Sequence, residues 1–156
     1  RHPELVEEVS AILSETGTDP RDLALEITES AMMKKGPKAV GILRALKGLG
    51  LTLVMDDFGT GYSSITYLKN FPVDVLKMDR SMVEGMDRDP QNRALVSAII
   101  DLAHTLGLEV VAEGVQTAAE LDKLRSMGCD IAQGYYWQRP CSAEKTTELL
   151  AVGSNP

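Results

Sequence analysis

The segment LTLVMDDFGTG, residues 51–61, runs from an apolar stretch directly into two adjacent aspartates and a glycine-containing turn. Four other segments follow the same plan, in which a short run rich in Val, Leu or Ile ends near a carboxylate or an amide. These segments are LALEITE (23–29), VDVLKMD (73–79), EVVAEG (109–114) and DIAQG (130–134). A helix-like pattern separates each from the next, and this alternation is typical of βα units on a parallel sheet.

Ligands of such α/β folds bind at the carboxyl ends of the strands. In this chain those ends carry Glu26, Asp56, Asp57, Lys77, Glu113 and Gln133. Oxygen ligands of this kind suit hard divalent cations. A ring of them around one lysine therefore predicts a metal site.

Five βα units are compatible with a doubly wound open sheet or with a (β/α)8 barrel. Functional residues at nearly every strand end favour the barrel, because all its strand ends face one mouth, whereas an open sheet concentrates them at a switch point. Complete barrels of this type have about 250 residues. We therefore expect these 156 residues to be one truncated α/β domain, the C-terminal part of a TIM-like barrel within a longer protein.

The composition excludes several classes of protein. A net charge of −7 argues against a surface that binds a nucleic-acid polymer. Two cysteines and two histidines provide neither a disulfide framework nor a histidine-rich zinc site, and they leave little for a serine or cysteine triad. We expect a reduced, cytoplasmic setting, and carboxylates, a lysine and hard metal ions as the chemical groups of an enzyme.

Each candidate residue also has an ordinary structural interpretation. The strand-end glutamates could be solvated, Asp56 and Asp57 could form a turn into a helix, and Lys77 could lie on an edge strand. Adjacent aspartates repel each other unless a cation lies nearby, which favours the metal interpretation. Asp79 could pair with Lys77, contact a ligand or cap the next segment. The glycines of Phe58–Ser64 match neither the dinucleotide nor the P-loop spacing.

Five linked motifs resemble the EAL family of cyclic-di-GMP phosphodiesterases: EITES, DDFGTGYSS, KMDRS, VVAEGVQT and AQGYYWQRP. The resemblance implies a TIM-like barrel that hydrolyses cyclic di-GMP to linear pGpG with two Mg²⁺ or Mn²⁺ ions. The Glu-Ala-Leu motif that names the family and its Asn-bearing strand would both precede Arg1 and are not in this sequence.

The resemblance also implies metal ligands. Glu26 would bind one metal, Asp56 would bridge both, and Asp57 and Glu113 would bind the second. Lys77 would hydrogen-bond the attacking water or the phosphate. We expect the carboxylates of Glu26, Asp56 and Glu113 to converge within about 8 Å, because the two metals of such sites lie about 4 Å apart.

Further implied roles lie around this centre. Glu29 would support the Asp57–Ser64 loop, which together with the following helix would also provide a homodimer contact. Gln133 would orient a water or a ligating carboxylate. Asp79 would bind substrate, and we expect Tyr135 to do the same by stacking on a guanine. Gln116 stands where the family usually has Glu, so a charged role at this position is lost.

Two other functions remain open from the sequence. A degenerate EAL module would bind cyclic di-GMP or a protein partner without catalysis, and a Mg²⁺-dependent lyase barrel would use the same carboxylates with a lysine base. Sensory or GGDEF domains and a membrane anchor would belong to parts of the parent chain outside these residues.

Overall fold

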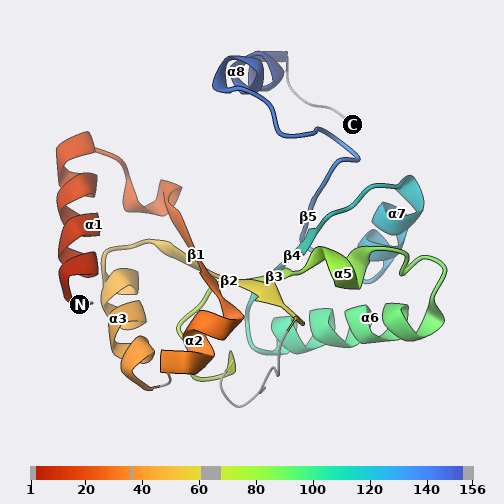
Figure 1. Cartoon of the computed structure of the whole chain (residues 1–156), viewed down its shortest axis with the longest axis horizontal. Helices are drawn as coiled ribbons and strands as arrows, with labels where there is room; N and C mark the ends of the chain where they lie inside the picture. The colour runs from red at the N-terminus through yellow and green to blue at the C-terminus, as the bar shows by residue number, and fades with distance from the viewer. Residues whose placement is uncertain (1–2, 36, 61–67, 153–156) are drawn as a thin grey trace.

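The computed structural model describes residues 3–35, 37–60 and 68–152, and its centre is one five-stranded parallel sheet. The strands are β1 (Ala24–Thr28), β2 (Thr52–Phe58), β3 (Val75–Met78), β4 (Glu109–Glu113) and β5 (Ile131–Gln133). They lie side by side in chain order, each parallel to the next (Figure 1). The predicted α/β fold with five parallel βα units is confirmed.

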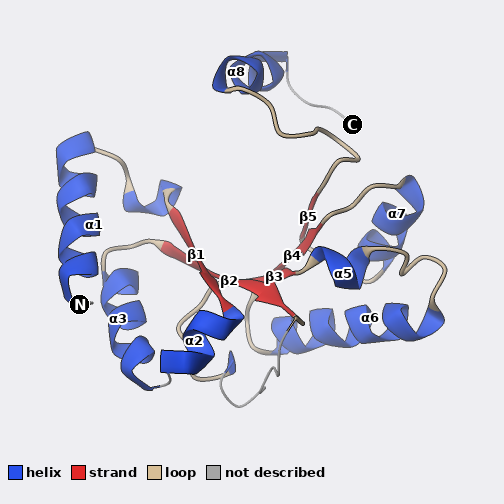
Figure 2. Ribbon diagram, viewed as in Figure 1, coloured by secondary structure: helices blue, strands red, loops and turns tan. Residues whose placement is uncertain are grey.

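Helices alternate with the strands along the chain. They are α1 (Pro3–Thr16), the 3-10 helix η1 (Pro20–Asp22), α2 (Glu29–Lys35), α3 (Pro37–Gly48), α5 (Arg80–Val83), α6 (Pro90–Thr105), α7 (Ala118–Ser126) and α8 (Ala143–Val152). Figure 2 shows α1, α2, α3 and α6 along the outer side of the sheet, whereas α8 lies apart at the top of the view. Leu150 of α8 is accordingly 75% exposed.

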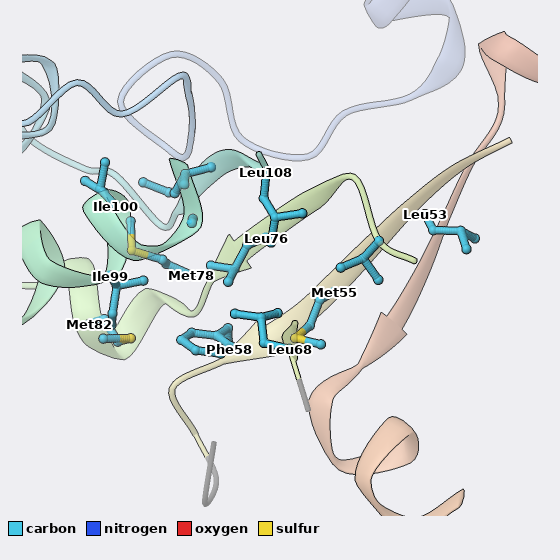
Figure 3. Close-up of a cluster of buried hydrophobic side chains, with 14 of the residues drawn as sticks. Leu53, Met55, Phe58, Leu68, Leu76, Met78, Met82, Ile99, Ile100 and Leu108 are labelled. Carbon is cyan, nitrogen blue, oxygen red and sulfur yellow. The ribbon is translucent and has the colours of Figure 1, made fainter. Parts of the chain in front are cut away.

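The two faces of the sheet have different chemistry because successive strand residues point to opposite faces. The outer face packs against the helices through the main core. Figure 3 shows part of this core, including Leu53, Met55, Phe58, Leu76 and Met78, all of them buried. The inner face carries a separate small cluster of Val54, Val75 and Val111. The inner face therefore has an apolar layer of valines, and polar side chains nearer the strand ends can pack against it.

A β-bulge interrupts β2 at the two aspartates. Met55 pairs with Leu76 and Phe58 pairs with Met78, so Asp56 and Asp57 together lie opposite the single residue Lys77. Asp57 takes a positive φ of 58°, which aspartate tolerates better than most residues with a side chain. As a result Met55 and Phe58 both reach the outer core, although three positions separate them along the strand.

Most element boundaries agree with the sequence patterns to within two residues, and two differences matter. β1 ends at Thr28 and Glu29 begins α2, a helix that the sequence pattern did not predict. The short helix α5 was also not predicted. The sequence also suggests Ser63 or Ser64 as the cap of the next helix, but both positions lie outside the described residues. Thr117 and Glu120 have the sequence spacing of a capping box, and the structure confirms this capping box at the start of α7.

Glu120 does more than cap its own helix. Its carboxylate is buried and accepts hydrogen bonds from the backbone N–H groups of Gln116 and Thr117, at 2.9 and 3.0 Å, and of Gly85 in the loop after α5, at 3.2 Å. Burial by itself would raise the pKa of Glu120, but these backbone donors hold it below its usual value. Glu120 thus connects the loop after β4 to the loop after α5.

We predict that Glu120→Ala destabilises the protein by about 1.5–3 kcal/mol, because buried N–H groups lose a charged acceptor. Since the folded-state pKa is depressed, this contribution is present above the unfolded-state value and is lost as the pH falls through the folded-state value. Denaturant unfolding should therefore show a smaller difference between parent and variant below about pH 4. Asp122→Ala, at an exposed position of α7, is the matched control and should change stability by less than about 0.5 kcal/mol. An equal loss in both variants would contradict the assignment.

Candidate functional site

Lys77 lies in β3 at the centre of the sheet, and its ammonium group is surrounded by carboxylates from three other positions. Lys77 Nζ is 2.8 Å from Glu26 Oε1, 2.8 Å from Glu113 Oε1 and 3.3 Å from Asp56 Oδ1. The lysine side chain is only 9% exposed. Because all three oxygens are close to one nitrogen, the carboxylates of β1, β2 and β4 lie well within the expected limit of about 8 Å.

The surroundings of Lys77 fix its charge. Burial would lower the pKa of its ammonium group, but the contacts with Glu113, Glu26 and Asp56 outweigh burial and raise the pKa above its usual value. In this arrangement Lys77 stays protonated at neutral pH and can donate hydrogen bonds. It is unsuited to act as a general base, which argues against a lyase with a lysine base.

The cluster has more negative than positive charge. Three carboxylates face one ammonium group, and Asp56 Oδ1 is buried without a hydrogen-bond partner among the described residues. Among the described residues, no three Asp, Glu, His or Cys side chains are already arranged as ligands of one ion. The donor set nevertheless fits hard divalent cations, which bind carboxylate oxygens and would offset the excess charge once Lys77 moves aside.

The two acidic residues next to this cluster have different positions. Asp57 is half-buried in the bulge, and the ion pairs of Lys77 do not include it. Glu29 is buried at the start of α2 and accepts a hydrogen bond from the backbone N–H of Gly59 at 3.4 Å. Glu29 therefore contacts the loop that follows Asp57, as its predicted supporting role requires, while the ligand role of Asp57 stays a prediction.

A cavity of about 220 Å³ lies beside Glu113. Its lining residues are Arg80, Glu113, Gly114, Gln116, Gln133, Gly134 and Tyr135. Glu113 and Gln133 are direct neighbours in the β4–β5 register, so both face the same side of the sheet. A Cβ atom on Gly134 would overlap the backbone of Val115, so only glycine allows this close approach of the two loops. The cavity has both polar and apolar walls, and one of its lining residues, Glu113, belongs to the carboxylate cluster.

Aromatic side chains continue from this cavity. Tyr135 is 50% exposed, and the guanidinium of Arg139 lies 4.9 Å from the centre of its ring. Tyr136 and Trp137 form an edge-to-face pair with centroids 5.1 Å apart. Tyr135 thus has an accessible ring at the cavity wall, where stacking on a base is geometrically allowed.

Asp79 lies just beyond β3 and caps α5. Its carboxylate accepts a hydrogen bond from the backbone N–H of Ser81 at 2.9 Å, and the contact with Ser81 lowers its pKa. Of the three roles open from the sequence, capping is the one observed, and a substrate contact stays a prediction. The pattern analysis missed Arg80 as a cavity residue, although it directly follows Asp79 in the motif KMDRS.

The family model of the EAL domain matches residues 1–140. The chain belongs to the EAL domain family. No helix among the described residues is long and apolar enough to cross a membrane.

Named relatives share this sequence and fold. The bifunctional diguanylate cyclase/cyclic di-GMP phosphodiesterase MucR of Pseudomonas aeruginosa is 42% identical over 150 residues, which are 96% of this chain and 22% of MucR. The cyclic di-GMP phosphodiesterase NbdA of the same species is 41% identical over 146 residues, which are 94% of this chain and 19% of NbdA. The chain spans about a fifth of the length of these relatives.

Solved structures agree with the assignment. The PaMucR phosphodiesterase in complex with c-di-GMP superimposes with a TM-score of 0.88 at 41% identity, over 93% of this chain and 59% of that one. Klebsiella pneumoniae BlrP1, in a complex with manganese and cy-diGMP, gives a TM-score of 0.84 at 33% identity, over 90% of this chain and 36% of BlrP1. The five strands therefore form part of a TIM-like EAL barrel.

We predict that Asp56→Asn stabilises the metal-free protein or leaves it unchanged, because it removes one charge from an overly negative cluster. The same change should reduce the rise in melting temperature that saturating Mn²⁺ causes, since a cation then gains less on binding. Differential scanning fluorimetry with and without Mn²⁺ measures both effects. Asp101→Asn, on an exposed part of α6, is the control and should change neither. A destabilised Asp56→Asn protein with a full response to Mn²⁺ would contradict the charge argument.

Proposed function

We propose that residues 1–156 are the C-terminal part of an EAL phosphodiesterase domain that hydrolyses cyclic di-GMP to linear pGpG. The observation that carries this proposal is the convergence of Glu26, Asp56 and Glu113 on one side of the sheet around Lys77. The names of the relatives MucR and NbdA, and the ligand in the PaMucR complex, support the same substrate.

Glu26, Asp56, Asp57 and Glu113 would hold two divalent ions, Mg²⁺ or Mn²⁺. Bound metal ions of this kind lower the pKa of a water molecule and stabilise charge on both the attacking and the leaving oxygen. The calcium and manganese complexes of the structural relative BlrP1 with cy-diGMP support the use of divalent cations. Asp56 Oδ1 is buried and forms an ion pair with Lys77, but it accepts no hydrogen bond among the described residues. This and the excess negative charge support a cation in this chain.

The protein's own side chains would bind and orient the substrate. The Lys77 ammonium would donate hydrogen bonds to a phosphate oxygen or to the attacking water, and Gln133 would orient that water or the Glu113 carboxylate. Tyr135 would stack on a guanine at the cavity wall, and Asp79 would contact the dinucleotide with the oxygen that does not cap α5. The valines beneath Lys77 would exclude bulk water from below the reacting atoms.

The same proposal includes the setting of the protein. Sensory or GGDEF domains would accompany this domain, as the bifunctional name of MucR suggests for that relative. The domain would act in the cytoplasm, where a membrane anchor elsewhere in the parent chain could hold it. A second copy would bind through the Asp57–Ser64 loop and the helix after it.

We predict that Lys77→Met and Glu113→Gln in the full-length protein each lower kcat for cyclic di-GMP by at least about 100-fold. Lys77→Met keeps an apolar stem but removes the charge and the donors, and Glu113→Gln keeps the shape but removes a ligand charge. The dinucleotide Kd should change far less, because contacts to the bases and the remaining phosphate contacts survive. Turnover assays and calorimetric binding with Ca²⁺ measure the two quantities separately.

Glu109→Gln is the matched control for Glu113→Gln, because Glu109 is an exposed glutamate at the opposite end of β4, and it should leave kcat unchanged. Equal losses of binding and turnover would make Lys77 and Glu113 binding residues only. A parent protein that binds cyclic di-GMP without turnover would be a receptor, and the phosphodiesterase proposal would fail.

We also predict that the 156 residues alone show very little activity. The Glu-Ala-Leu motif and the Asn-bearing strand, which would complete the ligand set, are not among them. The described sheet ends at β1 and β5, and edge strands of this kind promote association. Conversion of cyclic di-GMP to pGpG, followed by chromatography, tests this. Efficient metal-dependent turnover by the isolated chain would show that the missing strands are dispensable.

A further inference from the structure

The short helix α5 lies between two loops of the candidate site. It begins at Arg80, three positions after Lys77, which lies in the central strand β3. One neighbouring loop follows Asp57 at the end of β2, and the other follows Glu113 at the end of β4. Two side chains of α5 each contact a glycine in one of these loops. Met82 contacts Gly59 in the first loop, and Arg80 contacts Gly114 in the second.

Met82 packs on the loop that follows Asp57. Gly59 has a φ of +100°, and a Cβ atom built on it would overlap the Met82 sulfur and lie 3.2 Å from Met82 Cγ. The thioether therefore lies directly against the Gly59 backbone, whose N–H donates to Glu29. Figure 3 shows the buried Met82 side chain beside Phe58, the last residue of β2. The buried Met82 side chain thus supports the loop after β2 from its interior side.

Arg80 packs on the other loop in the same way. Gly114 directly follows Glu113 and has a φ of +75°. A Cβ atom built there would lie 2.6 Å from Arg80 Cβ and 2.9 Å from Arg80 Cδ, so the methylene stem covers the Gly114 backbone. Beyond this stem, the guanidinium of Arg80 lies 3.3 Å from the carboxylate of Glu84, one turn further along, in a solvent-exposed ion pair.

Helix α5 is itself attached to the outer layer. Asn92 of α6 donates a hydrogen bond from Nδ2 to the carbonyl oxygen of Met82 at 2.7 Å. The carboxylate of Glu120 in α7 accepts from the N–H of Gly85, two residues after α5 ends. Both partners lie in helices that pack on the sheet, so α5 has a fixed position relative to β3 and β4.

We propose that Arg80 and Met82 are positioning residues that set the separation between the aspartates of β2 and Glu113 of β4. The two side chains act through the glycine backbones next to the ligand residues and touch neither metal nor reacting atoms. This inference rests on the proposed metal-dependent function, because it assigns to α5 the task of holding the two sides of the metal site apart at a fixed distance.

The test uses four variants of the full-length protein. Met82→Ala and Arg80→Ala remove the two contacts, Arg80→Met keeps an unbranched apolar stem over Gly114 without the charge, and Met86→Ala truncates another fully buried methionine close to α5. The first readout is amide hydrogen exchange of the metal-free protein, in peptides covering residues 56–60 and 113–116. The second readout is the Kd for Mn²⁺, measured by electron paramagnetic resonance.

Met82→Ala should speed exchange in residues 56–60, and Arg80→Ala in residues 113–116, each by about tenfold or more. Both should weaken Mn²⁺ binding by about 10- to 100-fold, the usual range for residues that support metal ligands. Arg80→Met should restore both values to within about threefold of the parent. Met86→Ala should lower thermal stability without changing local exchange in these peptides or the Mn²⁺ affinity.

Two results would overturn the inference. One is exchange and Mn²⁺ affinity within about twofold of the parent in both Met82→Ala and Arg80→Ala. The other is an equal change in Met86→Ala, which would reduce the effect to general destabilisation. A parent protein that binds no Mn²⁺ would refute the proposed function instead, and the exchange data from the metal-free protein would still decide whether α5 holds the two loops.

Discussion

One buried ammonium group among three carboxylates is the interaction on which the inner face of this sheet depends. Lys77 is stable in a mostly buried position because Glu26, Asp56 and Glu113 surround it, and the carboxylates come together without a metal because Lys77 lies between them. The valine cluster below gives the group a dry floor. The result is a set of carboxylates that already lie close together, with an excess of negative charge that a divalent cation can offset.

The sequence predicted the strands and the gathering of their end residues for a simple physical reason. Apolar runs of four to seven residues must be buried, and parallel strands point the same way, so residues that follow such runs meet at one edge. Asp56 and Glu113 follow apolar runs as this rule requires, whereas Glu26 and Lys77 lie within β1 and β3. The resemblance to the EAL family rests on sequence motifs whose residues lie at the strand ends and carry the polar groups of the site, not on the residues that pack in the core.

Other features could not be predicted because they depend on contacts between distant segments. The bulge at Asp56 and Asp57 is visible only once β2 is paired with β3. Helix α5 has a single turn, too short for a periodic pattern, and Asn92 and Glu120 attach it to other helices. The start of α2 could not be predicted because Glu29, the last residue of the sequence segment with the apolar run, is also the first residue of the helix. In each case tertiary structure overrode the local pattern.

The bulge in β2 makes the number of acidic side chains at this point independent of the packing of the core. Deleting either aspartate would leave a regular ladder in which Met55 and Phe58 still pair with Leu76 and Met78 on the outer face. Such a strand would present one carboxylate where this one presents two. Inserting or deleting one residue at this point would therefore change the number of acidic side chains on the strand without repacking the interior.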